Sequence, residues 1–297
     1  MAQPASERLQ YEDITPARFV TAASLFDGHD ASINIMRRVL QSAGVEVIHL
    51  GHNRSVNEIV SAAIQEDADA IAVSSYQGGH IEFFSYMLDM LSRRGAAHIR
   101  IFGGGGGVIV QDEIQSLHAR GVTQIYSPED GRVMGLRGIV DDMLSRCGQR
   151  LPEPLDVSDL GQCDDLLLAR VISCLTDGGC PAALSKQLES MLHSMKSVPV
   201  VGITGTGGAG KSSLTDEIIR RFRLDFEDQL RIAVIAVDPS RRKSGGALLG
   251  DRIRMNSIDP RFVYMRSLAT RQSGMELPKN LEQVIESMKV SGFDLVL

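Results

Sequence analysis

The sequence predicts an α/β protein with two consecutive parallel-sheet domains. Between residues 18 and 146, five apolar runs rich in β-branched side chains alternate with five segments of helical periodicity. A further apolar run, at 198–204, leads into a glycine-rich loop and another helix-like segment. Apolar strands separated by helices are typical of parallel sheets that helices cover on both faces. A chain of 297 residues is long enough for about two such domains.

The first domain is expected over residues 1–150. Its predicted strands are 18–26, 45–51, 70–76, 99–105 and 123–127. Its predicted helices are 32–44, 56–67, 81–95, 111–121 and 131–147. In such folds ligands bind beyond the carboxyl ends of the strands, so the loops that follow the strands are the places to search for a site.

Composition and charge exclude several classes of protein. The formal net charge of -6 gives no reason to expect nucleic acid as a partner, since phosphate backbones bind to basic faces. No apolar run approaches the roughly 20 residues of a membrane span, and residues 1–13 lack the regions of a signal peptide. We therefore expect a cytoplasmic protein. The C-x-x-C spacing of zinc and redox sites is absent among Cys147, Cys163, Cys174 and Cys180.

Three loops after the predicted strands have unusual sequences. The first strand is followed by DGHDAS, the third by SSYQGGH, and the fourth by five consecutive glycines, Gly103–Gly107. Because parallel strands end at the same edge of a sheet, we expect the three loops to lie together. Glycine loses much backbone entropy on ordering, so the run of five indicates that a long, flat ligand approaches the backbone closely. The run lacks the first-strand position and the following acidic residue of a dinucleotide fingerprint, and a site for another phosphate ligand is the alternative.

His29 is the candidate metal ligand of these loops. One ring nitrogen can point outward, while Asp27, two residues earlier, can accept a hydrogen bond from the other. A carboxylate partner of this kind fixes the tautomer of a ligating histidine and raises its basicity. The alternative is a histidine near a helix start that makes only a local hydrogen bond.

The motifs D-G-H at 27–29, S-S-Y at 74–76 and G-G-V-I at 106–109 resemble the three signatures of a known domain. It is the flavodoxin-like (Rossmann-like) cobalamin-binding domain of adenosylcobalamin-dependent mutases and methionine synthase, and the resemblance covers about residues 15–150. The resemblance implies that His29 ligates cobalt in place of the cofactor's dimethylbenzimidazole, with Asp27 as its hydrogen-bonded partner. It implies further contacts with cobalamin at Ser74, Ser75, Tyr76, Gly106 and Gly107.

Two residues depart from these motifs. Ser32 stands where the first motif usually has glycine, and Tyr76 stands where the second usually has leucine. Neither change removes the metal ligand or the serine beside the tail, so we expect them to tune the loop and the pocket wall. His80 ends the second loop, and we expect it near the cofactor.

Residues 151–197 form a predicted helical linker. It opens with prolines and aspartates and continues with helix-like segments near 162–176 and 181–196. An apolar stripe at helical spacing in the second of these predicts packing against the next domain. The stripe is formed by Leu188, Met191, Leu192 and Met195.

The second domain, expected at 198–297, opens with a complete G-x-x-x-x-G-K-[ST] motif between a predicted strand and a predicted helix. Backbone N–H groups of such a loop and the following helix N-terminus face phosphates. Lys211 reaches the outer phosphates and is the candidate catalytic residue, and the Ser212 hydroxyl ligates magnesium. The candidate nucleotide-binding residues of the loop are Gly205, Gly207, Gly208, Ala209, Gly210, Lys211, Ser212 and Ser213.

Two further aspartates are candidates for the magnesium site. Asp238 ends a predicted strand and Asp251 follows thirteen residues later, and both carboxylates suit a hard cation. A helix cap or a surface position is the alternative for either. The stretches VDPS and GGALLGDR resemble the metallochaperone GTPases that escort cobalamin to acyl-CoA mutases, which implies that both aspartates belong to the magnesium environment. Arg252 and Arg254 are candidates for phosphate contact, although residues two apart on a helix cannot both point the same way.

No N-K-x-D element for reading guanine is present, so GTP rather than ATP is implied only by this resemblance. The apolar segment that ends at Leu297 is typical of the strand before a nucleotide-sensing switch. We therefore expect a P-loop NTPase domain that is truncated before its C-terminal part.

The order of the two domains resembles the fused isobutyryl-CoA mutases. The resemblance implies adenosylcobalamin, GTP and Mg2+ as cofactors and the isomerisation of isobutyryl-CoA to n-butyryl-CoA, with the GTPase gating cofactor loading. It implies an acyl-CoA substrate bound by a C-terminal barrel absent from this chain, so that these residues alone lack mutase activity. Further implied partners are a cobalamin adenosyltransferase and a second copy in a homodimer.

Three alternatives remain open. A cobalamin carrier fused to its delivery GTPase would have no mutase activity, and its reading frame would not continue into a barrel. A cobalamin-based light or redox sensor would carry a signalling helix pair or a DNA-binding domain rather than a phosphate loop. A doubly wound domain without cobalamin would use the glycines for another phosphate ligand.

Overall fold

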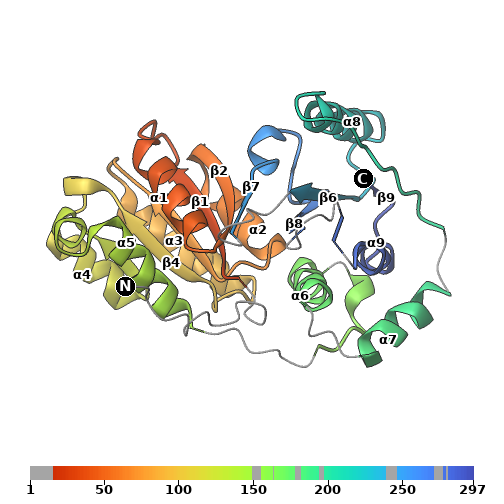
Figure 1. Ribbon diagram of the computed structural model, residues 1–297, viewed down its shortest axis with the longest axis horizontal. Coiled ribbons are helices and arrows are strands. Elements are labelled where there is room, and N and C mark those ends of the chain that lie inside the picture. Colours follow the sequence, from red (N-terminus) through yellow and green to blue (C-terminus); the bar gives the residue numbers. More distant parts are fainter. Residues whose placement is uncertain are drawn as a thin grey trace, which may run out of the picture.

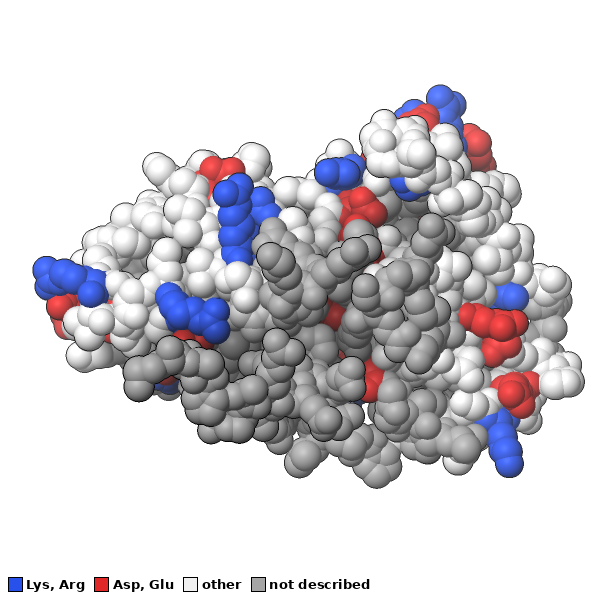
Figure 2. All heavy atoms as spheres, in the orientation of Figure 1, with Lys and Arg blue, Asp and Glu red and all other residues white. Residues whose placement is uncertain are grey.

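The computed structural model describes residues 16–148, 155–162, 164–177, 182–193, 197–238, 246–270, 277–278 and 280–297. Two parallel sheets organise these residues, one of six strands and one of three. Each sheet lies at the centre of one half of the molecule, and the linker helices pack beneath the second half (Figure 1). Acidic and basic side chains are interspersed over the face seen in Figure 2. In the described part of the chain, no helix is both long and apolar enough to cross a bilayer.

The first sheet has the strand order β5-β4-β3-β1-β2-β7. Its first five strands confirm the predicted alternation of strand and helix. They are β1 (Arg18–Ser24), β2 (Glu46–Arg54), β3 (Ala70–Ser74), β4 (Arg100–Gly104) and β5 (Gln124–Tyr126). The helices between and after them are α1 (Ala31–Ser42), α2 (Val56–Gln65), α3 (His80–Arg93), α4 (Gln111–Arg120) and α5 (Pro128–Cys147).

Helices cover both faces of this sheet, as the apolar strands require. One face packs on α2, α3 and α4 through side chains such as Ile59, Met87 and Leu117. The other face packs on α1 and α5 through Leu40 and Met143. Every residue of β1 and β3 is buried, because each of these strands has a neighbour on both sides and helices above and below.

The second sheet has the order β8-β6-β9. Its strands are β6 (Ile232–Asp238), β8 (Val263–Ala269) and β9 (Leu295–Val296), and its helices are α8 (Lys211–Asp225) and α9 (Leu281–Val290). The strand predicted at 198–204 is present only as a single bridge between Val200 and Val296. Pro199 has no amide hydrogen to donate, and β9 offers only two residues as partners.

The linker contributes α6 (Asp165–Thr176) and α7 (Ala182–Leu192). The predicted packing of its apolar stripe is confirmed, since Leu188 is buried and Met191 and Leu192 pack on the core around β8 and α9. Met195, Cys163 and Cys180 lie outside the described residues. Neither Cys147 nor Cys174 forms a disulfide within the described part.

The sixth strand of the first sheet comes from the far end of the sequence. β7 (Ala247–Leu249) pairs in parallel with β2, with Glu46 opposite Ala247 and Ile48 opposite Leu249. It is followed by the short 3-10 turn η3 (Arg252–Arg254). A segment expected within the second domain therefore extends the sheet of the first.

Candidate functional site

The loops after β1, β3 and β4 meet at one edge of the first sheet, as expected from their sequences. The Tyr76 amide donates to Asp27 Oδ2 at 2.6 Å, which joins the first loop to the second. The Ser75 amide donates to the Gly104 carbonyl at 2.8 Å, which joins the second to the third. Ser24 Oγ donates to Ser75 Oγ at 3.0 Å beneath them. Backbone and buried hydroxyl groups thus fix the three loops relative to one another.

His29 projects from this edge and is held by Asp27. Its Nδ1 atom lies 2.9 Å from Asp27 Oδ1, which also accepts the His29 backbone amide at 2.8 Å. The histidine side chain is 73% exposed, whereas the aspartate side chain is 0% exposed. Because Nδ1 is engaged with a carboxylate, a neutral ring carries its proton there and presents the Nε2 lone pair outward.

Asp27 is kept ionised by its hydrogen bonds. Burial opposes ionisation, but the backbone amides of Tyr76 and His29 donate to its carboxylate and lower its pKa. The carboxylate therefore accepts hydrogen bonds throughout the neutral range. It orients His29 and at the same time holds the second loop.

Two residues near His29 were missed by the sequence analysis. Phe26 has a left-handed φ of 64° and a side chain that is 75% exposed, directly before the D-G-H motif. Its amide donates to Asn53 Oδ1 at 2.8 Å, so the end of β2 supports the first loop. The left-handed Phe26 also explains why β1 ends at Ser24 instead of continuing to residue 26 as predicted. No sequence pattern connects residues 26 and 53, which are brought together by the pairing of β1 with β2.

A cavity of about 210 Å³ opens between the glycine loop, α1 and α5. Its walls are mainly apolar, with a few hydroxyl groups among them. Ser74 Oγ and Ser32 Oγ are buried, and neither has a hydrogen-bond partner among the described residues. Buried hydroxyls without partners are costly, so a ligand group that bonds to them would stabilise the site. The side chains that face the cavity include Ile33, Met36, Phe102, Tyr126, Ile139 and Met143.

The last three of the five glycines occur in this loop for different physical reasons. A Cβ atom on Gly105 would lie 2.0 Å from the Ser75 carbonyl oxygen, so no other residue fits there. Gly106 has a φ of +58°, and a Cβ on it would lie 2.9 Å from the Tyr76 ring. A Cβ atom on Gly107 would meet no atom within 4 Å in the part of the chain that the structure describes. The fold itself therefore requires Gly105 and Gly106, whereas only a bound ligand would require Gly107.

His80 is turned away from this site, contrary to expectation. Its Nδ1 lies 3.1 Å from the Gln77 carbonyl oxygen and its Nε2 lies 3.0 Å from Glu113 Oε2. The side chain is buried with both nitrogens engaged. Its position ties the start of α3 to the start of α4.

The glycine-rich loop at 205–210 lies exposed before α8. Gly208 and Gly210 have φ values of +80° and +82°, which L-residues with side chains rarely adopt. Lys211 Nζ donates to the carbonyls of Gly205 and Thr206 at 2.8 and 3.0 Å. The lysine thus lies across the loop, beside the backbone amides at the N-terminus of α8. Ser213 is exposed on the first turn of α8.

Ser212, Asp238 and Asp251 form a polar site beside this loop. Ser212 Oγ donates to Asp251 Oδ1 at 2.8 Å. Asp238 Oδ2 is buried and has no hydrogen-bond partner among the described residues. Burial and then the nearby charge of Asp251 raise the pKa of Asp238 to about 6. Two adjacent carboxylates, one with an unpartnered oxygen, and a hydroxyl are ligands that a hard cation prefers.

The two arginines that were considered for phosphate contact have different surroundings. Arg252 is buried, and it donates to Glu66 Oε1 at 3.2 Å and to the Met265 carbonyl at 2.6 Å. Arg252 is therefore a structural residue between the two sheets, and the proposal of a phosphate contact was wrong. Arg254 is exposed, and its charge opposes the rise in the pKa of Asp238. Of the two, only Arg254 lies free to face an anion.

Two families match this chain. Residues 17–129 match the family described as "B12 binding domain". Residues 168–297 match the family described as "Methylmalonyl Co-A mutase-associated GTPase MeaB". The first match includes Asp27, His29 and the glycine loop, and the second includes the 205–210 loop, Asp238 and Asp251.

Curated relatives match along almost the whole chain. A fused isobutyryl-CoA mutase of Cupriavidus metallidurans is 61% identical over 94% of this chain, and one of Nocardia farcinica is 56% identical over 95%. This chain spans only 26% of the length of each. A 2-hydroxyisobutanoyl-CoA mutase small subunit of Aquincola tertiaricarbonis is 31% identical over 43% of this chain and 95% of its own length.

Proposed function

We propose that this chain, which belongs to the family of the fused isobutyryl-CoA mutases, is the part of such an enzyme that binds both cofactors. It spans about a quarter of the length of these two relatives. Its first half binds adenosylcobalamin and its second half binds GTP with Mg2+. The complete enzyme isomerises an acyl-CoA, with isobutyryl-CoA as the proposed substrate. The substrate binds to a barrel that lies outside this chain.

The outward Nε2 of His29 is the single observation that carries this proposal. A ring that is fixed by a buried carboxylate and exposed on its other side suits a cobalt ligand, and its oriented lone pair would bind the metal. Bound adenosylcobalamin supplies the radical chemistry of the carbon-skeleton rearrangement. His29 and Asp27 position it.

The neighbouring cavity suits the base of this cofactor. Its apolar walls suit the aromatic base that His29 would displace from cobalt, and the unpartnered Ser74 hydroxyl is available to the base or its tail. Gly107 leaves the backbone open to close approach, and Gly106 allows the Tyr76 ring to lie against the same loop. Tyr76 also lines the cavity, and its ring centroid lies 5.6 Å from that of His29. Ser75 lies beside this wall, where its hydroxyl accepts a hydrogen bond from Ser24, and we propose that it supports the cobalamin site.

The second half has the groups that a nucleotide and its metal need. The backbone amides of the 205–210 loop and the N-terminus of α8 would bind phosphates, with Lys211 as the charge on the outer phosphates. Ser212, Asp238 and Asp251 would hold Mg2+, because the buried oxygen of Asp238 has no other partner among the described residues. Arg254 is proposed as a phosphate contact. We propose that the nucleotide controls how readily the cobalamin site is loaded, in a homodimer that receives its cofactor from an adenosyltransferase.

The visible absorption spectrum of the chain with adenosylcobalamin tests the first half. We expect the main band to move from the position of base-on cofactor to that of base-off, histidine-ligated cofactor. His29→Ala should abolish this change, whereas His193→Ala, on the exposed end of α7, should not. An unchanged spectrum with no retained cofactor would refute the cobalamin site.

Binding of a fluorescent GTP analogue tests the second half. We expect Mg2+-dependent binding that is lost in Lys211→Ala and kept in Lys289→Ala, on the far side of the same half at the end of α9. Binding that is equal in both variants would exclude the 205–210 loop as the phosphate site.

A further inference from the structure

The segment 246–254 is attached to both candidate sites. At one end β7 is hydrogen-bonded to β2, the strand next to β1 in the first sheet. Beyond it, Asp251 accepts the Ser212 hydroxyl at the start of α8. A segment of nine residues therefore connects the proposed nucleotide site to the sheet that carries the proposed cobalamin site.

Arg252 fixes the middle of this segment. Its guanidinium donates to Glu66 and Gln65 at the end of α2 and to the Met265 carbonyl on β8. Asp251 and Ile253 lie on either side of this fixed point. The Arg254 amide donates to the Asp251 carbonyl at 2.9 Å, so η3 is one hydrogen-bonded turn. A displacement of Asp251 would therefore rotate this turn about Arg252 and move Ile253 on its other side.

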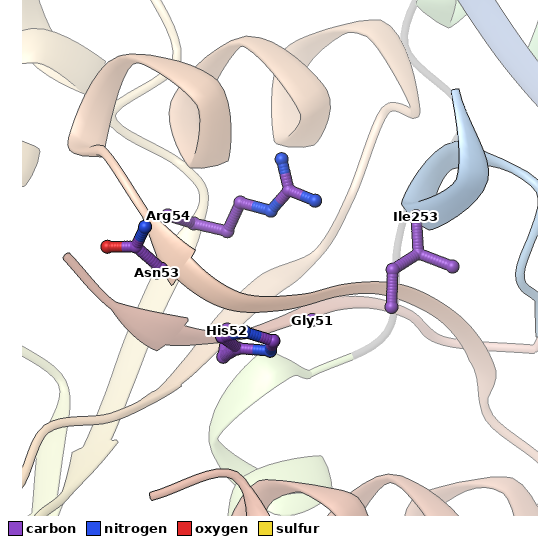
Figure 3. Close-up of a pocket in the computed structure, with 5 residues that line it drawn as sticks. All are labelled: Gly51, His52, Asn53, Arg54 and Ile253. Atoms are coloured by element: carbon purple, nitrogen blue, oxygen red, sulfur yellow. The ribbon is translucent and has the colours of Figure 1, made fainter. Parts of the chain in front are cut away.

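Ile253 packs on the backbone of β2 at Gly51. A Cβ atom on Gly51 would lie only 2.8 Å from Ile253 Cδ1, and Gly51 has a φ of +84°. Figure 3 shows Ile253 pointing from its turn toward Gly51, with Asn53 and Arg54 farther along the same strand. These residues and His52 line a cavity of about 300 Å³. The contact is direct, and the adjacent cavity leaves space for it to shift.

Asn53 continues this connection to the loop of the proposed cobalt ligand. It has a φ of 56°, and its side-chain oxygen accepts the amide of Phe26, which has a φ of 64°. Asp27 and His29 follow directly. Two residues in sparsely populated backbone conformations, joined by one hydrogen bond, form a link that can change between discrete arrangements.

We infer that Ile253 and Asn53 are positioning residues that connect occupancy of the Ser212–Asp251 site to the position of the loop that carries His29. This inference rests on the proposed function and adds a physical route to it. Asp238 and Asp251 would hold the cation, and its charge would offset the repulsion between the two carboxylates so that Asp251 would move toward Asp238. The turn η3 then moves Ile253 against Gly51, and Asn53 shifts the Phe26 amide.

The test measures how a nucleotide changes the affinity for adenosylcobalamin. The dissociation constant is determined by absorption titration of the chain with and without a non-hydrolysable GTP analogue and Mg2+. The affinity ratio is the dissociation constant without nucleotide and Mg2+ compared with that in their presence. Coupling between sites typically changes affinity by about 5-fold to 150-fold, and we expect an affinity ratio in this range for the wild type. Ile253→Ala should bring the ratio to within about twofold of one, while each ligand alone binds within about threefold of wild type. Ile253→Met, which refills the contact, should keep the ratio.

Asn53 gives a second, independent pair of variants. Asn53→Gly keeps the positive φ but removes the acceptor for Phe26, so the ratio should fall as in Ile253→Ala. Asn53→Asp keeps the acceptor and should keep the ratio. A wild type that binds both ligands with a ratio of one, or an unchanged ratio in both Ile253→Ala and Asn53→Gly, would overturn the inference.

Hydrogen exchange separates this inference from the proposed function. Without cobalamin, the nucleotide analogue and Mg2+ should change the exchange rate of the Phe26 amide in the wild type and not in Ile253→Ala. If the chain binds no cobalamin but this difference is present, the cobalamin proposal fails and the connection stands. If nucleotide binds but exchange at Phe26 is unaffected, the connection fails alone.

Discussion

Arg252 Nε lies 3.2 Å from Glu66 Oε1, and both side chains are almost completely buried. The two residues are 186 positions apart and belong to different halves of the protein. Glu66 also accepts the backbone amide and the hydroxyl of Ser267 on β8, each at 2.9 Å. The end of α2 is therefore bound to η3 and to the second sheet at once, by a carboxylate with no access to water.

Removal of this carboxylate should destabilise the protein strongly. Glu66→Ala leaves Arg252 buried without its charge partner, which typically costs about 3–5 kcal/mol of unfolding free energy. Urea unfolding measures this loss. Asp141→Ala, which breaks the exposed pair with Arg137, should cost less than about 1 kcal/mol. In Glu66→Met combined with Arg252→Met, part of the stability should return, because neither charge of this pair remains buried. Equal losses for Glu66→Ala and Asp141→Ala would contradict this account.

Asp27 should contribute to cofactor affinity although it touches only protein groups. In Asp27→Asn the side-chain amide cannot accept from the Tyr76 amide and from both His29 donors at once. Loss of a partner of this kind typically weakens a metal site by about 10–100-fold, and we expect this loss in the affinity for adenosylcobalamin. The matched control is Asp30→Asn, because Asp30 is exposed and makes no side-chain cap bond to α1. An unchanged affinity in Asp27→Asn would show that His29 needs no orientation.

Two glycine substitutions should separate the needs of the fold from those of the ligand. Gly105→Ala should lower the melting temperature of the chain without cofactor, since its Cβ would overlap the Ser75 carbonyl at 2.0 Å. Gly107→Ala should leave that temperature unchanged, because no atom of the described residues lies within 4 Å of the added Cβ. If the cofactor tail lies over the glycine loop, Gly107→Ala should nevertheless weaken adenosylcobalamin binding. A variant at Gly107 that melts and binds like the wild type would remove this glycine from the site.

The sequence was sufficient to predict the first sheet and the grouping of its loops. Each strand is a short apolar run between helical segments, so the pattern of the chain determines the layers. Asp27 and His29 were identified because they are two residues apart, and their contact is local. The phosphate loop was identified for the same reason.

Features that depend on distant segments could not be predicted. β7 has only three residues, and its pairing depends on the free edge of β2, about 200 positions earlier. Arg252 and Arg254 are equivalent in the sequence, and only the buried Glu66 distinguishes them. Likewise, His80 faces Glu113 because α3 and α4 are neighbours, which no local pattern shows.

His49 should make the protein sensitive to weak acid. It lies on β2 with Nδ1 2.9 Å from Thr21 Oγ1. Burial and then the charge of Arg37 lower its pKa to about 4 from the usual 6.5. A folded-state pKa below that of the unfolded chain means that the stability contributed by neutral His49 is complete above about pH 6.5 and is lost as the pH falls toward 4.

Urea unfolding at about pH 7 and at about pH 5 measures this effect. Between these pH values the wild type should lose about 1–2 kcal/mol more unfolding free energy than His49→Gln loses. Glutamine cannot take up a proton, but it can still bond to Thr21. His193→Gln is the matched control, because that histidine is exposed at the end of α7 and should leave the acid sensitivity unchanged. Since Gly51 and Asn53 follow His49 on the same strand, protonation should also speed hydrogen exchange at the end of β2. If His49→Gln loses as much stability as the wild type over this range, another group is responsible for the acid sensitivity.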